Sequence, residues 1–194
     1  MSAALPLVLA SASPRRQQML REAGIPFVCH PADIVETALP NEAPAAHVER
    51  LAAAKAAAIA PRYPQQLVLG ADTIVYLDGQ IIGKPRDLAD ARRMIEWLNG
   101  RTHHVYTGVC LRRETPPAGA VWHCITAVTF RRLDAAAITR YLREADCLDK
   151  AGAYALQDHE DLLIAGYDGP RSNVVGLPLE SVRERLPTLA GAAG

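Results

Sequence analysis

Residues 67–77 read LVLGADTIVYL, an apolar run near the middle of the chain on which the fold assignment rests. Its β-branched and aromatic residues predict a strand, and Asp78-Gly79 directly after it predicts a hairpin turn into a short strand at 80–83. Asp72 interrupts the apolar pattern. A carboxylate is rarely buried without a partner, so Asp72 either caps a turn or stands at the end of a central strand, where α/β sheets place their chemistry.

Predicted strands and helices alternate on both sides of this run. Before it we expect strands at 5–10 and 25–29, helices at 14–24 and 44–60, and an irregular polar segment at 30–43. After it we expect a helix at 87–100, long strands at 102–113 and 120–131, a helix at 134–143, short glycine-punctuated strands, and a final helix opened by GLP at 176–178. The alternation predicts an α/β fold, and the long hairpin makes the central sheet mixed. We expect a single domain over residues 1–194, with helices flanking the sheet and two lobes around a central cleft.

The composition is ordinary for a globular protein and limits the classes of partner. The 194 residues are 49% hydrophobic and 22% charged, and the formal net charge is zero. A neutral chain argues against nucleic-acid binding through a general basic field, so any anion site must be local. No leader-like segment or membrane-length apolar run is present, and we expect a cytoplasmic protein with no membrane partner.

The four cysteines are expected to be free thiols, most of them buried. They lie far apart and lack both a C-x-x-C pair and a histidine at zinc-ligand spacing. His103 and His104 fall in a predicted strand and therefore face opposite sides, so we assign them to structure.

The segment 9-LASASPRRQQML-20 puts cations at the start of a predicted helix. Ser13 is a favoured N-cap and Pro14 a favoured first helical residue. Arg15 and Arg16 follow in the first turn, where the helix dipole is already positive. An anion shared by the free amides and the guanidinium groups would reconcile these features, and a phosphate fits.

The predicted helix at 44–60 carries a lysine on its apolar face. Val48 and Ile59 mark that face, and Lys55 lies between them at helical spacing. Lys55 either extends its ammonium to the rim of the protein or points into a cleft at an anion, and the helix alone favours neither.

Three further charged residues are weaker candidates. Lys84 in GKP and Lys150 in DKAGAY stand beside glycines, where backbone can approach a ligand closely, although turn formation explains them equally well. Glu36 is an isolated carboxylate in a polar loop.

Together these residues form a set of cations and carboxylates: Arg15, Arg16, Lys55, Lys84, Lys150, Asp72 and Glu36. Such a set suits metal-assisted attack on a polyphosphate, since cations neutralise phosphate oxygens while carboxylates hold a divalent ion and activate water. The sequence lacks the Walker A, G-x-G-x-x-G and G-x-S-x-G motifs, and Ser11 and Ser13 have no evident His–Asp partners. The residues alone predict a hydrolase of phosphate esters or anhydrides.

Eight segments in order resemble the Maf-like nucleotide pyrophosphatases, also called septum-formation inhibitor proteins: LASASPRR, VET, RLAAAKA, LGADTIV, GKP, THHVYTGV, DKAGAYALQ and VVGLPL. The resemblance implies a two-lobed fold related to the inosine triphosphate pyrophosphatases. It also implies hydrolysis of a nucleoside triphosphate to the monophosphate and pyrophosphate, with Mg²⁺ or Mn²⁺, and a homodimer.

The same resemblance implies a role for each matching residue. Asp72 matches the general base, Glu36 and Asp72 match metal-site carboxylates, and the catalytic set is Asp72, Glu36, Lys55 and Lys84. The matching substrate-binding residues are Ser11, Ser13, Arg15, Arg16, Thr73, Lys150 and Gln157.

Arg15, Thr73 and Gln157 resemble the branch of the family that acts on dTTP and UTP. The branch acting on 7-methyl-GTP carries Trp, Gln and Glu at these places, and an aromatic face with a carboxylate suits a cationic methylated purine. A glutamine offers a donor and an acceptor to a neutral pyrimidine edge. The chain departs from the family pattern at Ala54, at 158–161 and at 168–173.

Two alternatives stay open at this point. The substrate could be 7-methyl-GTP or a non-standard purine triphosphate. The protein could also be a nucleotide-binding regulator of cell division whose partner binding matters more than hydrolysis.

Overall fold

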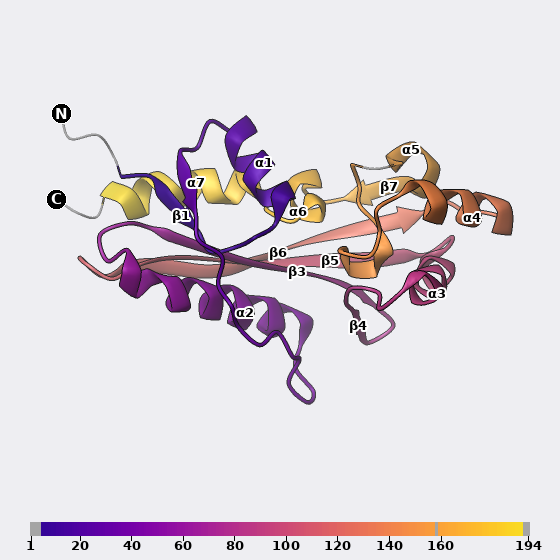
Figure 1. Cartoon of the computed structure of the whole chain (residues 1–194), viewed down its shortest axis with the longest axis horizontal. Helices are drawn as coiled ribbons and strands as arrows, with labels where there is room; N and C mark the ends of the chain where they lie inside the picture. The colour runs from indigo at the N-terminus through magenta and orange to yellow at the C-terminus, as the bar shows by residue number, and fades with distance from the viewer. Residues whose placement is uncertain (1–4, 158, 192–194) are drawn as a thin grey trace. The chain divides into compact units, whose positions relative to one another are not determined.

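A computed structural model describes residues 5–157 and 159–191 (Figure 1). Its elements follow the predicted alternation: β1 (Leu7–Leu9), α1 (Pro14–Glu22), β2 (Phe27–Cys29), α2 (Pro44–Ile59), η1 (Ala60–Arg62), β3 (Val68–Leu77), β4 (Gln80–Ile82), α3 (Leu88–Leu98), β5 (Thr102–Arg113), β6 (Ala118–Phe130), α4 (Ala135–Glu144), η2 (Ala151–Ala153), α5 (Glu160–Leu163), β7 (Ile164–Asp168), α6 (Arg171–Val175) and α7 (Leu179–Gly191).

The strands form a mixed sheet. Within the described ranges it has seven strands in the order β2-β1-β3-β5-β6-β7, with β4 paired to β3. β1 pairs in parallel with β2 and β3, whereas the β3–β4 and β6–β7 pairs are antiparallel. Asp78 and Gly79, both at positive φ, form the predicted turn between β3 and β4. The predicted α/β class with a mixed central sheet is confirmed.

The chain divides into two compact units. The first consists of Met1–Asp72, Thr107–Cys124 and Gly176–Gly194, and the second of Thr73–Tyr106 and Ile125–Val175. Strands β3, β5 and β6 contribute residues to both units. The division agrees with the expectation of two lobes, while the cleft and the single domain stay predictions.

In the first unit, glycines let a helix pack directly on the strands. Figure 1 shows α2 along one face of the strands and α7 along the opposite face. A Cβ atom on Gly70 of β3 would lie 2.1 Å from the carbonyl oxygen of Ala52, and one on Gly108 of β5 would lie 2.2 Å from that of Val48. A glycine inside a strand marks such a close backbone approach. These two positions therefore set how close α2 comes to the sheet.

In the second unit, two helices begin at the predicted caps and are joined through one asparagine. The carboxylate of Asp87 accepts a hydrogen bond from the amide of Asp90 (2.7 Å), and that of Asp134 from the amide of Ala137 (2.8 Å). Asn99, directly after α3, donates to the carbonyl of Leu133 and accepts from its amide.

The segment between α4 and α7 corrects one prediction. The sequence suggested several short strands there, but its described residues contain one strand, β7, with the helical turns η2, α5 and α6. The reason is visible at Gly152, which adopts a φ of 69° within η2 and donates its amide to the carbonyl of Gly83. A left-handed φ favours turns over strands. The strand expected to begin at 120 also begins two residues earlier, at Ala118.

The adjacent histidines of β5 differ in exposure, as expected for neighbouring residues of a strand. His103 is fully buried and His104 is exposed. Burial lowers the pKa of His103 to about 3, with a smaller contribution from His104. The cysteines are free, and only Cys29 among them is exposed. In the part of the chain that the structure describes, no helix combines the length and apolar character needed to cross a membrane.

The close approach of α2 yields a stability prediction. Gly70→Ala forces a methyl group against helix backbone, and we expect a loss of about 3 kcal/mol in the free energy of unfolding, at the upper end for overpacking. Urea titration of the purified variants measures this loss.

Gly166→Ala in β7 is the matched control, because a Cβ there meets no described heavy atom within 4 Å. It should change stability by less than about 1 kcal/mol. Equal losses in the two variants would contradict the proposed role of Gly70.

Candidate active site

In the first unit, two of the predicted carboxylates converge on the ammonium group of a third predicted residue, Lys55. The Nζ atom of Lys55, on α2, lies 2.7 Å from Oδ1 of Asp72 on β3. The same Nζ lies 2.6 Å from Oε1 of Glu36, in the irregular segment between β2 and α2. The side chains of Lys55 and Asp72 are only 7% and 10% exposed, whereas that of Glu36 is 49% exposed. The site therefore joins a buried ion pair to a carboxylate accessible to solvent.

Local structure explains how Lys55 reaches Asp72. Gly70 and Asp72 are two residues apart in β3, so they lie on the same face of that strand. At Gly70 that face meets the backbone of α2 at Ala52, and Lys55 follows one helical turn later. Lys55 turns inward to two carboxylates and does not extend to the rim of the protein. Both expectations for Asp72 were wrong, because it lies in the middle of β3, neither capping a turn nor ending the strand, and accepts from Lys55.

The start of α1 forms a second polar cluster in the same unit. Ser13 caps the helix, since its Oγ accepts from the amide of Arg16 (3.4 Å). Ser11 accepts from the amide of Ser13 (3.3 Å) and from Nη1 of Arg16 (3.0 Å). The Nε of Arg16 donates to the carbonyl of Gly176 (2.8 Å), and Arg15 is half-buried in the same turn. The guanidinium of Arg16 is therefore buried and held from two sides.

Electrostatics connects Arg16 with the carboxylates. Burial lowers the pKa of Arg16, and the charge on Asp72 opposes that effect. Arg15 lowers the pKa further, and Glu36 acts in the same direction as Asp72. The negative charges of Asp72 and Glu36 therefore both act on the Arg16 cation.

The other four predicted residues belong to the second unit. Lys84 and Gln157 are exposed, Thr73 is half-buried and Lys150 is buried. The Nζ of Lys150 donates to Oδ1 of Asp149 (2.7 Å) and to the carbonyl of Asp146. The Gly152–Gly83 hydrogen bond brings the loops that carry Lys84 and Lys150 together. The functional roles of these residues stay predictions.

A set of residues that the sequence pattern does not mark connects the loop carrying Glu36 with α2. Glu42, at the end of that loop, contacts His47 and Arg50 on α2. A glutamate two residues before the helix is a weak signal, because carboxylates are common near helix N-termini.

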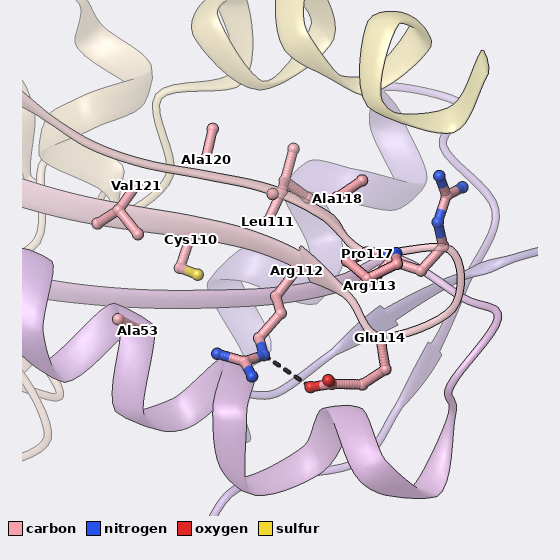
Figure 2. Close-up of a pocket in the computed structure, with 11 residues that line it drawn as sticks. Ala53, Cys110, Leu111, Arg112, Arg113, Glu114, Pro117, Ala118, Ala120 and Val121 are labelled. Carbon is pink, nitrogen blue, oxygen red and sulfur yellow. Dashed lines mark hydrogen bonds and ion pairs between the residues drawn. The ribbon is translucent and has the colours of Figure 1, made fainter. Parts of the chain in front are cut away.

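A separate hollow of about 530 Å³ lies on the β5–β6 hairpin of the first unit (Figure 2). Ala53 lines it together with hairpin residues, and Arg112 and Glu114 form an ion pair of 2.7 Å at its edge. None of the predicted site residues is among the residues that line it.

The donor set at Lys55 suits a hard divalent cation. Two carboxylates already converge on one positive group, and together with Lys55 they carry a net negative charge. Mg²⁺ is usually bound by one or two carboxylates, with substrate phosphates and water completing its coordination. No group of three or more His, Cys, Asp or Glu suited to a metal occurs among the described residues. Glu36 and Asp72 are the residues of this cluster that could contribute oxygen ligands to such a cation.

The chain is similar to several known proteins over most of its length. The family model described as "Maf-like protein" matches residues 6–189. A "dTTP/UTP pyrophosphatase" of Moorella thermoacetica is 49% identical, over 93% of each chain. A protein of the same name from Symbiobacterium thermophilum is 46% identical over 97% of this chain and 98% of its own length. Another from Myxococcus xanthus is 49% identical over 89% of this chain and 87% of its own.

The buried ion pair yields a second stability prediction. Lys55→Met leaves the carboxylate of Asp72 buried without its cation, and we expect a loss of about 3 kcal/mol in the free energy of unfolding. Asp72→Asn in the Lys55→Met background should recover part of the loss, since it removes the uncompensated charge. Urea unfolding at neutral pH measures both effects.

Arg112→Met is the matched control, because it removes the cation of an exposed ion pair in the same unit. Its cost should be below about 1 kcal/mol. If Lys55→Met cost no more than Arg112→Met, the Lys55–Asp72 pair would not be a structural requirement.

Proposed function

The chain belongs to the Maf-like protein family, and we propose that it hydrolyses dTTP and UTP to the nucleoside monophosphate and pyrophosphate. Three relatives named dTTP/UTP pyrophosphatase, 46–49% identical over most of their length, support the substrate. The observation that carries the proposal is the convergence of Asp72 and Glu36 on the buried ammonium of Lys55. That arrangement has the charges that attack on a phosphoanhydride needs.

In the proposed reaction, water attacks the α-phosphorus of the nucleotide. Asp72 accepts a proton from that water, and the P–O bond to the β-phosphate breaks, so that pyrophosphate leaves. Lys55 holds the carboxylate of Asp72 in place through Oδ1, and its positive charge favours the charge that develops on the phosphate oxygens. The reaction consumes one water and needs no other reactant.

A divalent cation, Mg²⁺ or Mn²⁺, fits the carboxylates of Glu36 and Asp72, which we propose as its protein ligands. When bound, it would neutralise phosphate oxygens and increase the electrophilicity of the phosphorus. The exposure of Glu36 suits this role, since a ligand shared with a substrate phosphate must be reachable from solvent.

We propose that phosphate is bound at the start of α1 by Ser11, Ser13 and Arg16. Amides at a helix N-terminus together with a guanidinium form a favourable anion site. Lys84 and Lys150 are proposed as further phosphate ligands. Lys150 would then exchange its contacts with Asp149 and Asp146 for contacts with the substrate.

We assign recognition of the base to Arg15, Thr73 and Gln157. Gln157 is exposed, so its amide can donate to and accept from the neutral edge of uracil or thymine. A positive charge at Arg15 disfavours the cationic base of 7-methyl-GTP.

Other expectations from the sequence are part of the same proposal. We propose one domain over residues 1–194, a homodimer and a cytoplasmic location, with neither nucleic acid nor membrane as a partner. Participation of β3, β5 and β6 in both units supports a single domain.

Substrate preference is tested by pyrophosphate release with Mg²⁺ or Mn²⁺ from dTTP, UTP, CTP, 7-methyl-GTP, ITP and the ordinary purine triphosphates. We expect kcat/KM for dTTP and UTP to exceed that for the purine nucleotides by at least about tenfold, which corresponds to about 1.4 kcal/mol. A preference for 7-methyl-GTP would overturn the assignment of Arg15, Thr73 and Gln157. Absence of release from every nucleotide would favour the regulatory alternative.

The role of Asp72 is tested by Asp72→Asn, which keeps the size of the side chain but removes its basicity. We expect pyrophosphate release from dTTP to fall at least about 100-fold, as for loss of a general base. Circular dichroism should show an unchanged fold. Turnover at the wild-type rate would refute the proposed role.

A further inference from the structure

The carboxylate of Glu42 is saturated with donors although it lies at the end of an irregular loop. Its side chain is only 7% exposed. Arg50 donates Nε to Oε1 (2.5 Å) and Nη2 to Oε2 (2.7 Å), which is the bidentate geometry of a strong charge-assisted pair. Nδ1 of His47 (2.8 Å) and the amide of Leu39 (3.1 Å) also contact Oε2. These contacts fix the position of the Glu42 carboxylate.

These contacts join the loop of Glu36 to the helix of Lys55. Residues 30–43 contain neither helix nor strand, so the backbone ladder of a regular element does not hold Glu36 in place. Nη2 of Arg50 also donates to the carbonyl of Thr37 (3.2 Å), the residue directly after Glu36. Arg50 lies on α2, five residues before Lys55. One guanidinium therefore contacts both the end of the loop, at Glu42, and the neighbour of Glu36.

The charges of this cluster reinforce one another. Hydrogen bonds from Arg50 hold the pKa of Glu42 well below its usual range, although burial opposes that shift. The Glu42 carboxylate in turn raises the pKa of Arg50, and the negative charge on Asp72 adds to the effect. Glu42 and Arg50 are therefore both ionised at neutral pH, and the negative charge of Asp72 also acts on Arg50.

We propose that Glu42, His47 and Arg50 are positioning residues that hold Glu36 against Lys55 and thereby set the affinity of the site for a divalent cation. The inference rests on the proposed function, because it takes Glu36 as a metal ligand. The three residues act through the loop backbone and through Glu36. Without them the loop would have to be ordered when the metal binds, and that entropy loss would lower the affinity.

Binding of Mn²⁺ alone to the nucleotide-free protein tests the inference, with free Mn²⁺ measured by electron paramagnetic resonance. Glu42→Gln should weaken binding at least about tenfold, within the range for partners that orient metal ligands. Glu36→Gln should weaken binding directly. The double variant should bind no more weakly than Glu36→Gln, because the positioning set has nothing to position once the ligand is lost.

Glu114→Gln is the matched control. It also removes one negative charge and the partner of an arginine in the first unit, but Glu114 pairs with Arg112 on the hairpin. Its Mn²⁺ affinity and its kcat/KM for dTTP should equal those of the wild type. The proposal would be overturned if Glu42→Gln bound Mn²⁺ as tightly as the wild type. It would also be overturned if the loss of Mn²⁺ affinity in the double variant equalled the product of the losses in the two single variants.

Arg50→Lys keeps the test decisive if Glu42→Gln does not fold. It keeps the positive charge but removes the planar guanidinium group whose nitrogens contact Glu42 and Thr37. The Mn²⁺ affinity should therefore fall again. Unchanged affinity in Arg50→Lys would also overturn the inference. If the proposed function is wrong, the wild type releases no pyrophosphate, whatever the Mn²⁺ affinities of the variants. If only the positioning role is wrong, the wild type still releases pyrophosphate and the Mn²⁺ affinities alone contradict the inference.

Discussion

A lysine ammonium and an aspartate carboxylate lie 2.7 Å apart beneath the surface of the first unit, and much of that unit's structure follows from keeping them together. Removing two charges from water is costly unless each meets an opposite charge at close range. A helix and a strand must therefore hold them at one distance. The backbone of α2 meets Gly70 of β3 two residues before Asp72 and one helical turn before Lys55. The absence of a side chain at Gly70 thus lets α2 approach β3 closely enough for Lys55 to pair with Asp72.

The need to keep the Lys55–Asp72 pair together also explains why the charged side chains of the site differ in exposure. Lys55 and Asp72 are buried and paired, whereas Glu36 reaches the pair from a loop and stays half exposed. A site that binds a cation together with a polyphosphate benefits from this combination, because preorganised charges lose little energy on reorganisation while an accessible ligand allows exchange. Arg16 adds a buried cation, and the charges of Asp72 and Glu36 raise its pKa against the effect of burial.

Much of the fold follows from local chemistry in the sequence. Ser13-Pro14, Asp87 and Asp134 predicted helix starts correctly, since capping depends on neighbouring backbone groups only. Lys55 and Asp72 stand out in the sequence because each breaks an apolar pattern. The prediction for the segment between α4 and α7 is wrong, because Gly152 adopts a left-handed φ within a helical turn and the residue types do not mark such a turn.

The amino-acid sequence alone predicts the α/β class, the mixed sheet and the set of cations and carboxylates. These features depend on residue type and spacing along the chain. The pairing of Lys55 on α2 with Asp72 on β3 is visible only in the tertiary structure. Periodicity marks the buried face of a helix or strand, but it does not identify the partner of a charged side chain on that face. Here the partner is determined by the approach of two elements distant in sequence, which the glycines beneath α2 allow.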